Sequence, residues 1–239
     1  MKDFLNSIPP VVKNILGINI ILWLLTLVAP GFFLRFGMDI NIEDFLGMHY
    51  WASEKFNPAQ LVTYMFMHDP SSFMHIFFNM FAVYMFGAAL ENVWGPRKFL
   101  FYYLVTGVGA GIVQQLFWTV EFQPFITAMN DSILANPGHS GEIILHKISQ
   151  LNLPVTIGAS GSVFGLLLAF GWLFPEARLI MIFFPIPIKA RIFVLIYGVI
   201  ELFQGVANFS GDNVAHFAHL GGMLFGVILL LIWKKKRFL

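Results

Sequence analysis

Charged residues are scarce in this chain of 239 residues, and cysteine is absent. Asp, Glu, Lys and Arg make up 11% of the sequence, against about 25% in soluble domains. Hydrophobic residues make up 58%, and the mean hydropathy is +0.75. These values predict an all-α polytopic membrane protein. The missing cysteines exclude disulfides, thiol catalysis and thiolate metal sites. A net charge of only +1 argues against a nucleic-acid partner.

Hydrolase signatures that use a metal or two aspartates are also missing. The chain has neither the H-E-x-x-H pattern of zinc peptidases nor a G-x-G-D aspartyl motif. His216 and His219 are three residues apart, but no carboxylate stands with them as zinc hydrolysis would usually require. We therefore expect no metal and no other cofactor.

Six apolar runs are long enough to be membrane helices, with the fifth beginning after the Pro185–Lys189 break. They cover roughly residues 14–34, 72–94, 97–117, 155–174, 190–204 and 213–233. The first run follows Lys2 and Lys13, as in a signal peptide, but it lacks a clear cleavage site, and we interpret it as a retained helix. No internal repeat is evident, so residues 1–239 are predicted to form one membrane domain.

Basic residues indicate which ends of these helices face the cytoplasm. With both termini inside, eleven of the fourteen Lys and Arg residues are cytoplasmic, and only Arg35, Lys55 and Lys147 are outside. The opposite orientation inverts that ratio. We expect a multi-pass protein of a bacterial inner membrane with both termini in the cytoplasm.

Two outer connectors are long, at about residues 36–71 and 118–154. The first mixes aromatic and polar residues, which suits a structure partly embedded at the interface. The second contains the turn signal Asn136-Pro137-Gly138. Apolar positions 144, 145, 148 and 151 then predict a short interfacial helix whose simplest role is a packing lid.

Polar residues at the outer ends of three predicted helices should lie at one depth. His75 and Asn79 fall in the first turns of the second helix, Ser160 in those of the fourth, and His216 in the first turn of the sixth. These three helices run in the same direction, so the side chains form one layer about 5–12 Å below the outer boundary. Ionisable groups in membrane helices are costly and therefore often functional.

Glycines suggest that the fourth and sixth helices touch. Gly161 and Gly165 are four apart, as are Gly222 and Gly226, and small residues at this spacing allow close helix contact. Such contact would bring Ser160 within hydrogen-bonding distance of His216, a histidine that could activate it as a nucleophile. A tight helix pair with a Ser–His hydrogen bond and no reaction is the competing interpretation.

Three further side chains could support that pair. Phe164 could stack on the imidazole of His216, or could simply face lipid or core. His75 and Asn79 could donate hydrogen bonds to a developing oxyanion, or could bond only between helices.

The motifs His75-Ile76-Phe77-Phe78-Asn79, Gly158-Ala159-Ser160-Gly161 and His216–Gly222 together resemble those of the rhomboid family of intramembrane serine proteases. They match the family's H-x-x-x-N, G-x-S-G and H-x-x-H-L-G-G patterns. The turn with Glu91, Gly95 and Arg97 is also similar. The resemblance covers about residues 60–230 and implies a six-helix, rhomboid-like bundle.

The resemblance also implies roles for individual residues. Ser160 would be the nucleophile and His216 the general base, with His75 and Asn79 lining the oxyanion hole. Gly158 and Gly161 would leave room around the nucleophile, and Phe164 would stack on the base. His68 resembles another family histidine at a wider spacing, and no Trp-Arg pair occurs in the first outer loop.

Two other side chains are weaker candidates for a catalytic role. Asp212 precedes His216 by four residues, but we expect it to be solvated or to cap the sixth helix. Ser162 is turned about 200° away from Ser160 on the same helix.

The expected function is that of a serine endopeptidase cleaving single-span membrane proteins near the outer membrane face. Its partners would be transmembrane protein substrates and the lipid bilayer, with substrate entering sideways past the fifth helix and the 205–212 connector. The alternatives are a catalytically silent relative that binds transmembrane clients and a transporter that uses the polar layer.

Overall fold

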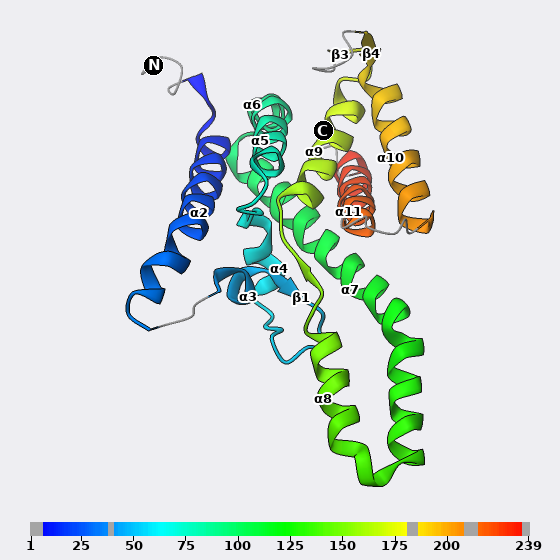
Figure 1. Ribbon diagram of the computed structural model, residues 1–239. Helices are drawn as coiled ribbons and strands as arrows, with labels where there is room; N and C mark the ends of the chain where they lie inside the picture. The colour runs from blue at the N-terminus through cyan, green and yellow to red at the C-terminus, as the bar shows by residue number, and fades with distance from the viewer. Residues whose placement is uncertain (1–6, 38–40, 181–185, 208–214, 236–239) are drawn as a thin grey trace.

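The computed structural model describes residues 7–37, 41–180, 186–207 and 215–235. The chain is almost entirely helical (Figure 1). Its helices are α2 (Pro10–Leu34), α3 (Ile42–Leu46), α4 (Gln60–Thr63), α5 (Phe73–Ala82), α6 (Ala88–Trp94), α7 (Pro96–Ala135), α8 (Ser140–Leu151), α9 (Ser160–Leu173), α10 (Ala190–Ala207) and α11 (His216–Lys235). A π-helical turn at Val83–Gly87 joins α5 to α6, and 3₁₀ turns occupy Tyr64–Phe66 and Pro137–His139.

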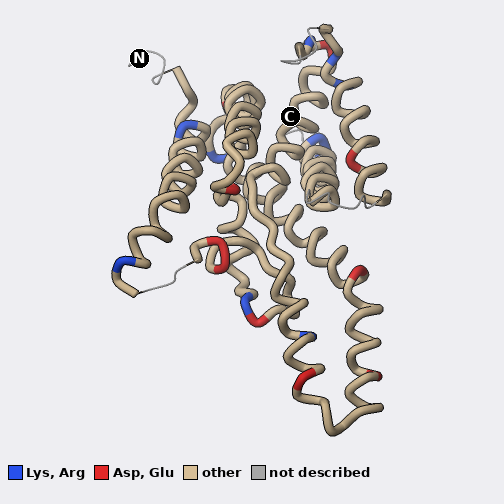
Figure 2. Tube along the Cα trace, viewed as in Figure 1, with Lys and Arg blue, Asp and Glu red and all other residues tan. Residues whose placement is uncertain are grey.

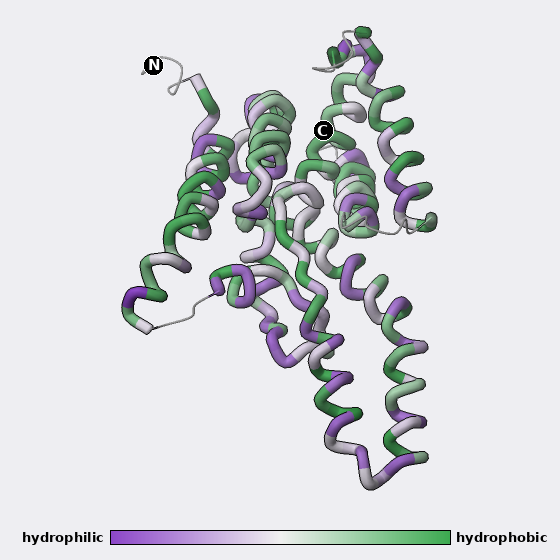
Figure 3. Tube along the Cα trace, in the orientation of Figure 1, coloured by the Kyte–Doolittle hydropathy of each residue, from purple (hydrophilic) through white to green (hydrophobic). Residues whose placement is uncertain are grey.

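Among the described residues, five helical segments are long and apolar enough to cross a membrane: α2, α5 to α6, α7, α10 and α11. Their apolar residues dominate the hydropathy view (Figure 3). The remaining predicted span, the fourth, corresponds to α9, which is apolar but has only 14 residues. It begins at Ser160 rather than residue 155, because Val155 and Thr156 form a strand. The prediction of an all-α, multi-pass membrane protein is confirmed.

Helix α9 is enclosed by the rest of the bundle. It packs against α7, α11, α10 and the α5–α6 segment, and Leu166 and Ala169 have no exposed surface. At 1.5 Å per residue it spans about 21 Å, less than the roughly 30 Å of hydrocarbon in a bilayer. Its first residue therefore lies inside the bundle, below the ends of the longer helices.

Helix α7 departs most from the sequence prediction, which ended it near residue 117. It runs for 40 residues to Ala135 and carries Pro124 within it. At about 60 Å it is twice the thickness of the hydrocarbon core, so its second half projects from the bundle (Figure 1). Polar residues end the hydrophobic run after Trp118, but the first strong helix-breaking sequence is Asn136-Pro137-Gly138.

The predicted short helix of the second loop is present as α8, which folds back along α7. Lys147 Nζ donates to Asn130 Oδ1 at 2.9 Å, and Phe125 meets the His146 ring edge-on at 6.3 Å. The predicted apolar face is only partly correct. Leu151 is buried, but Leu145 is 68% exposed because the contact face is rotated around the helix.

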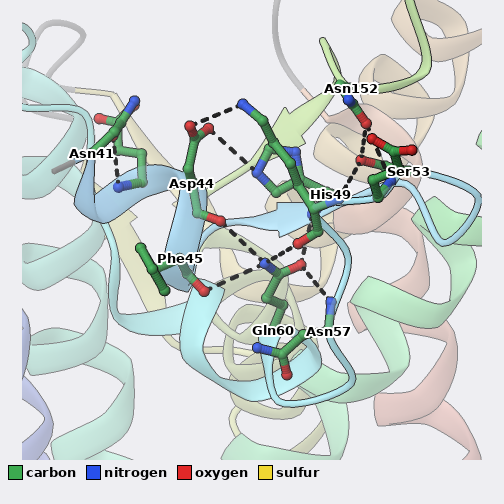
Figure 4. Close-up of polar contacts among 11 residues, drawn as sticks. Asn41, Asp44, Phe45, His49, Ser53, Asn57, Gln60 and Asn152 are labelled. Atoms are coloured by element: carbon green, nitrogen blue, oxygen red, sulfur yellow. Dashed lines mark hydrogen bonds and ion pairs between the residues drawn. The ribbon is translucent and has the colours of Figure 1, made fainter. Parts of the chain in front are cut away.

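The first outer loop is organised around the buried Gln60 side chain (Figure 4). Its Nε2 donates to the carbonyl oxygens of Asp44, Phe45 and Lys55, at 2.9–3.3 Å. Its Oε1 accepts the backbone N–H groups of His49 and Asn57. One amide thus contacts five backbone groups, with one of its two N–H bonds shared between carbonyls, so a loop of short elements holds a fixed shape.

This loop also fixes the segment that leads into α9. Strand β1 (Met48–His49) pairs antiparallel with β2 (Val155–Thr156), placing Met48 opposite Thr156. The Ser53 hydroxyl donates to Asn152 Oδ1 at 2.6 Å (Figure 4). On the other side of the bundle, β3 (Arg178–Ile180) and β4 (Pro187–Lys189) form a second antiparallel pair before α10. The predicted surface connector of residues 178–189 is therefore a β-hairpin where it is described.

Glu91 caps the start of the first membrane helix from another element. Its side chain, on α6, is 3% exposed, and its carboxylate oxygens accept the N–H groups of Val11 and Val12 at 3.0 and 2.8 Å. These belong to the first turn of α2, where a helix has no acceptors of its own and its dipole favours negative charge.

We expect Glu91→Ala to lower the free energy of unfolding by about 1.5–3 kcal/mol, because two N–H groups lose a charged acceptor. Thermal denaturation in detergent measures this change. The control is Glu142→Ala, which removes an exposed carboxylate from the first turn of α8 and should change the midpoint much less, because solvent screens a surface charge. Equal midpoints for the two variants would contradict the capping role.

Candidate functional site

Ser160 is the first residue of α9, and a glycine-dependent turn delivers it there. Gly158 has φ of +129°, a conformation that other residues rarely adopt, and its N–H donates to the carbonyl of Tyr64 at 3.0 Å. The hydroxyl of Tyr64 in turn donates to the carbonyl of Gly107 on α7 at 2.7 Å. The loop, α7 and the start of α9 are therefore tied together around the serine.

The Ser160 hydroxyl hydrogen-bonds to His219, not to His216. Ser160 Oγ lies 2.8 Å from His219 Nε2, and the His219 side chain is only 9% exposed. The expected partner, His216, begins α11 one turn earlier, and its Nδ1 lies 2.7 Å from Glu201 Oε2. The sequence prediction of a Ser160–His216 pair is therefore corrected to Ser160–His219.

The contact between Gly161 and Gly222 explains why Ser160 bonds to His219 rather than to His216. A Cβ on Gly222 would overlap the carbonyl oxygen of Gly161, so the backbones of α9 and α11 meet there. His219 lies one turn before Gly222 on the same face and is level with Ser160. His216 is six residues before Gly222, about 9 Å along the axis. Of the other two glycines, Gly165 faces Thr106 of α7 rather than α11, whereas Gly226 lies against Tyr102 of α7 and Leu168 of α9.

Phe164 packs on the histidine that bonds Ser160. Its ring stacks on His219 with centroids 4.2 Å apart and an interplanar angle of 11°. The predicted stacking is thus present on His219 instead of His216. Ser162 points elsewhere, as expected: it is 1% exposed and donates to the carbonyl of Tyr103 at 2.9 Å.

His75 also lies near the nucleophile. A Cβ on Gly158 would lie 2.9 Å from His75 Nε2 and 3.7 Å from Ser160 Oγ, so the missing side chain leaves space between these atoms. The N–H of Asp69 approaches His75 Nδ1 at 3.4 Å, which assigns the ring proton to Nε2. A hydrogen-bond donor thus borders the space beside Ser160.

Gly161 and Asn79 have structural contacts near this space. Gly161 leaves room for α7, since a Cβ there would lie 2.5 Å from the Cβ of Ala110. Asn79 is 7% exposed, and its Nδ2 donates to the carbonyl of His75 at 2.8 Å. That amide group therefore supports the helix turn that carries His75.

His68 lies behind His75 and has no exposed surface. The two rings meet at 60°, with centroids 5.0 Å apart. Burial, with a smaller contribution from His75, lowers the pKa of His68 to about 3. The His68 imidazole is therefore neutral near pH 7 and packs as an uncharged ring.

Glu201 is the residue near the site that sequence reasoning missed. It lies on α10, is 5% exposed, and its Oε2 is 2.8 Å from His219 Nδ1 as well as 2.7 Å from His216 Nδ1. The sequence did contain a signal for it, since Glu201 is an acidic residue inside an apolar helix. Such a residue is costly in a membrane and is usually paired with another polar group. Asp212, considered earlier as an acid partner, lies outside the described residues.

These features define a polytopic membrane protein with a partly buried Ser–His pair at the start of an enclosed helix. The rhomboid domain family model matches residues 55–236, and the chain belongs to the rhomboid family.

Named relatives are similar at low identity. The chain is 25% identical over 233 residues to the rhomboid protein YdcA of Bacillus subtilis, covering 95% of this chain and 92% of that protein. It is 28% identical to Rhomboid protein 1, mitochondrial, of Saccharomyces cerevisiae and 29% identical to Rhomboid-like protein 11, chloroplastic, of Arabidopsis thaliana. Those matches cover 65% and 75% of this chain, but only 37% and 53% of the relatives.

Proposed function

We propose that the protein is an intramembrane serine endopeptidase that cleaves single-span membrane proteins near the outer membrane face. Ser160 is the nucleophile and His219 the general base. The hydrogen bond between Ser160 Oγ and His219 Nε2, at 2.8 Å within an apolar bundle, carries the proposal. Membership of the rhomboid family supports the reaction class.

The chemistry follows from the positions of these groups. Ser160 Oγ attacks the carbonyl carbon of the substrate peptide bond while its proton passes to His219 Nε2. The oxyanion accepts hydrogen bonds from His75 Nε2–H and from the Ser160 N–H, which starts α9 and has no acceptor within the helix. His219 then protonates the leaving amine, and water hydrolyses the acyl-enzyme with His219 again acting as base.

Basic residues support the proposed orientation and localisation. In Figure 2 most blue segments lie at the end of the bundle where α2 begins and α11 ends. That end faces the cytoplasm, with both chain termini, if basic residues are retained inside. Ser160 then lies toward the outer face, from which water reaches it. Similarity along almost the whole length of a relative from a bacterium supports a bacterial inner (plasma) membrane as the location.

The test is covalent labelling of the purified protein with a fluorophosphonate probe, beside cleavage of a single-span substrate in proteoliposomes. We expect Ser160→Ala to lose both labelling and cleavage. Serine proteases that lose the nucleophile show a fall in kcat of about 10⁶-fold. Ser162→Ala is the matched control and should still be labelled, because Ser162 faces α7. Labelling that persists in Ser160→Ala would overturn the proposal.

A catalytically silent protein that binds transmembrane clients is the second candidate. It predicts that wild type captures a single-span protein without cleaving it, and that the probe does not react. The presence of both a serine and a histidine in hydrogen-bond contact favours the peptidase.

A further inference from the structure

Glu201 is a buried carboxylate in an otherwise lipid-facing helix. In α10 only Ala190, Val194 and Glu201 are buried. Its Oε2 accepts hydrogen bonds from the Nδ1 atoms of His216 and His219, which come from the first two turns of α11. A charge taken from water is tolerated only with such partners. The carboxylate is therefore held in place by two histidines and is not solvated.

This contact decides the proton arrangement of His219. A carboxylate only accepts hydrogen bonds, so the proton of the neutral ring lies on Nδ1. Nε2 then presents its lone pair to Ser160 Oγ, which is the arrangement that a general base requires. Phe164 stacks on the ring face, while Glu201 and Ser160 hold the two ring nitrogens. The imidazole is thereby fixed in both orientation and tautomer.

We propose that Glu201 is a positioning residue for the reaction of the preceding subsection, on which this inference rests. It orients His219 for Ser160 and balances the positive charge that the imidazole gains when it takes the serine proton. Ser160, His219 and Glu201 form a Ser–His–Glu triad whose acid comes from α10. His216 donates the second hydrogen bond that keeps the carboxylate satisfied.

A zinc site is the competing use of the same three residues. Donor atoms of Glu201, His216 and His219 lie within 4.8 Å of one another, and two histidines with a glutamate are a zinc ligand set. Ligands held tetrahedrally at about 2.0–2.2 Å from zinc stand roughly 3.4 Å apart. The observed separations of 2.7 and 2.8 Å are those of hydrogen bonds instead. The geometry favours the triad.

The experiment compares full-length wild type with Glu201→Gln, Glu201→Asp and the control Glu142→Gln, which makes the same change at an exposed position of α8. We expect Glu201→Gln to lower kcat and the fluorophosphonate labelling rate by about 10²–10⁴-fold, with KM changed little. Glu201→Asp should recover part of kcat, and Glu142→Gln should match wild type. A purely structural role of Glu201 would lower thermal stability. It would not lower kcat while KM stays nearly constant, and Glu201→Asp would not recover kcat.

Each contrary result has a separate meaning. Wild-type kcat in folded Glu201→Gln, beside Ser160-dependent wild-type cleavage, overturns the positioning role alone. Wild type that neither cleaves nor reacts overturns the proposed function, and this inference falls with it. Activity lost to a chelator and restored by zinc assigns the residues to a metal site and also overturns the triad.

If Glu201→Gln does not fold, proton NMR of the wild type decides. A strongly hydrogen-bonded His219 Nδ1 proton should resonate far downfield and be missing in His219→Gln. Its absence from wild type would overturn the inference.

Discussion

Replacing His219 with glutamine is expected to abolish cleavage, whereas His216→Gln should keep kcat within about tenfold of wild type. Glutamine at 219 can hydrogen-bond to Ser160 but cannot take its proton, and loss of the base costs about 10⁶-fold in kcat in serine proteases. His216 contacts Glu201 and stands one turn farther from the Gly161–Gly222 contact. Its loss removes one of two hydrogen bonds to a buried carboxylate.

These two variants are a matched pair, because each changes a buried histidine of α11 bonded to the same oxygen of Glu201. Cleavage of a single-span substrate and the rate of fluorophosphonate labelling measure the difference, with thermal melts to confirm folding. An inactive His216→Gln beside an active His219→Gln would restore the pairing first expected from the sequence.

The second large effect is expected from Gly222→Ala. A methyl group there would overlap the carbonyl of Gly161, and a helix backbone cannot move aside as a flexible side chain can. The two helices must separate, and Ser160 and His219 move apart because each lies within one turn of the contact. Misplacement of catalytic groups by about 1 Å costs about 10²-fold in rate. Overpacking also lowers stability, by about 1–3 kcal/mol.

Gly17→Ala is the matched control, since it adds the same methyl group to a membrane helix where no atom lies within 4 Å. It should retain activity and stability. Reaction rates and thermal midpoints of the two variants test the prediction together. Full activity in Gly222→Ala would show that the close contact does not set the Ser160–His219 distance.

Motif and hydropathy patterns predicted much of the fold. The apolar runs located all six core helices, with α10 beginning at Ala190 as expected from the preceding prolines. The apolar runs did not predict the end of α7. The apolar sequence stops at the membrane surface, but a helix continues until turn-forming residues interrupt its backbone. These patterns also could not reveal that Gln60 organises the first loop, since its five hydrogen bonds go to backbone groups whose positions depend on the fold.

At the site, the sequence alone determined which residue types were available and at what depth. Ser160, His75, Asn79 and His216 were predicted from spacing and direction, whereas His219 was considered only as a metal ligand. The tertiary structure decided which histidine faces the serine, because that depends on the register of α9 against α11 at Gly161 and Gly222. It also brought Glu201 to His219 from a helix that no local pattern linked to either motif. Residues far apart in sequence meet only where helix packing places them.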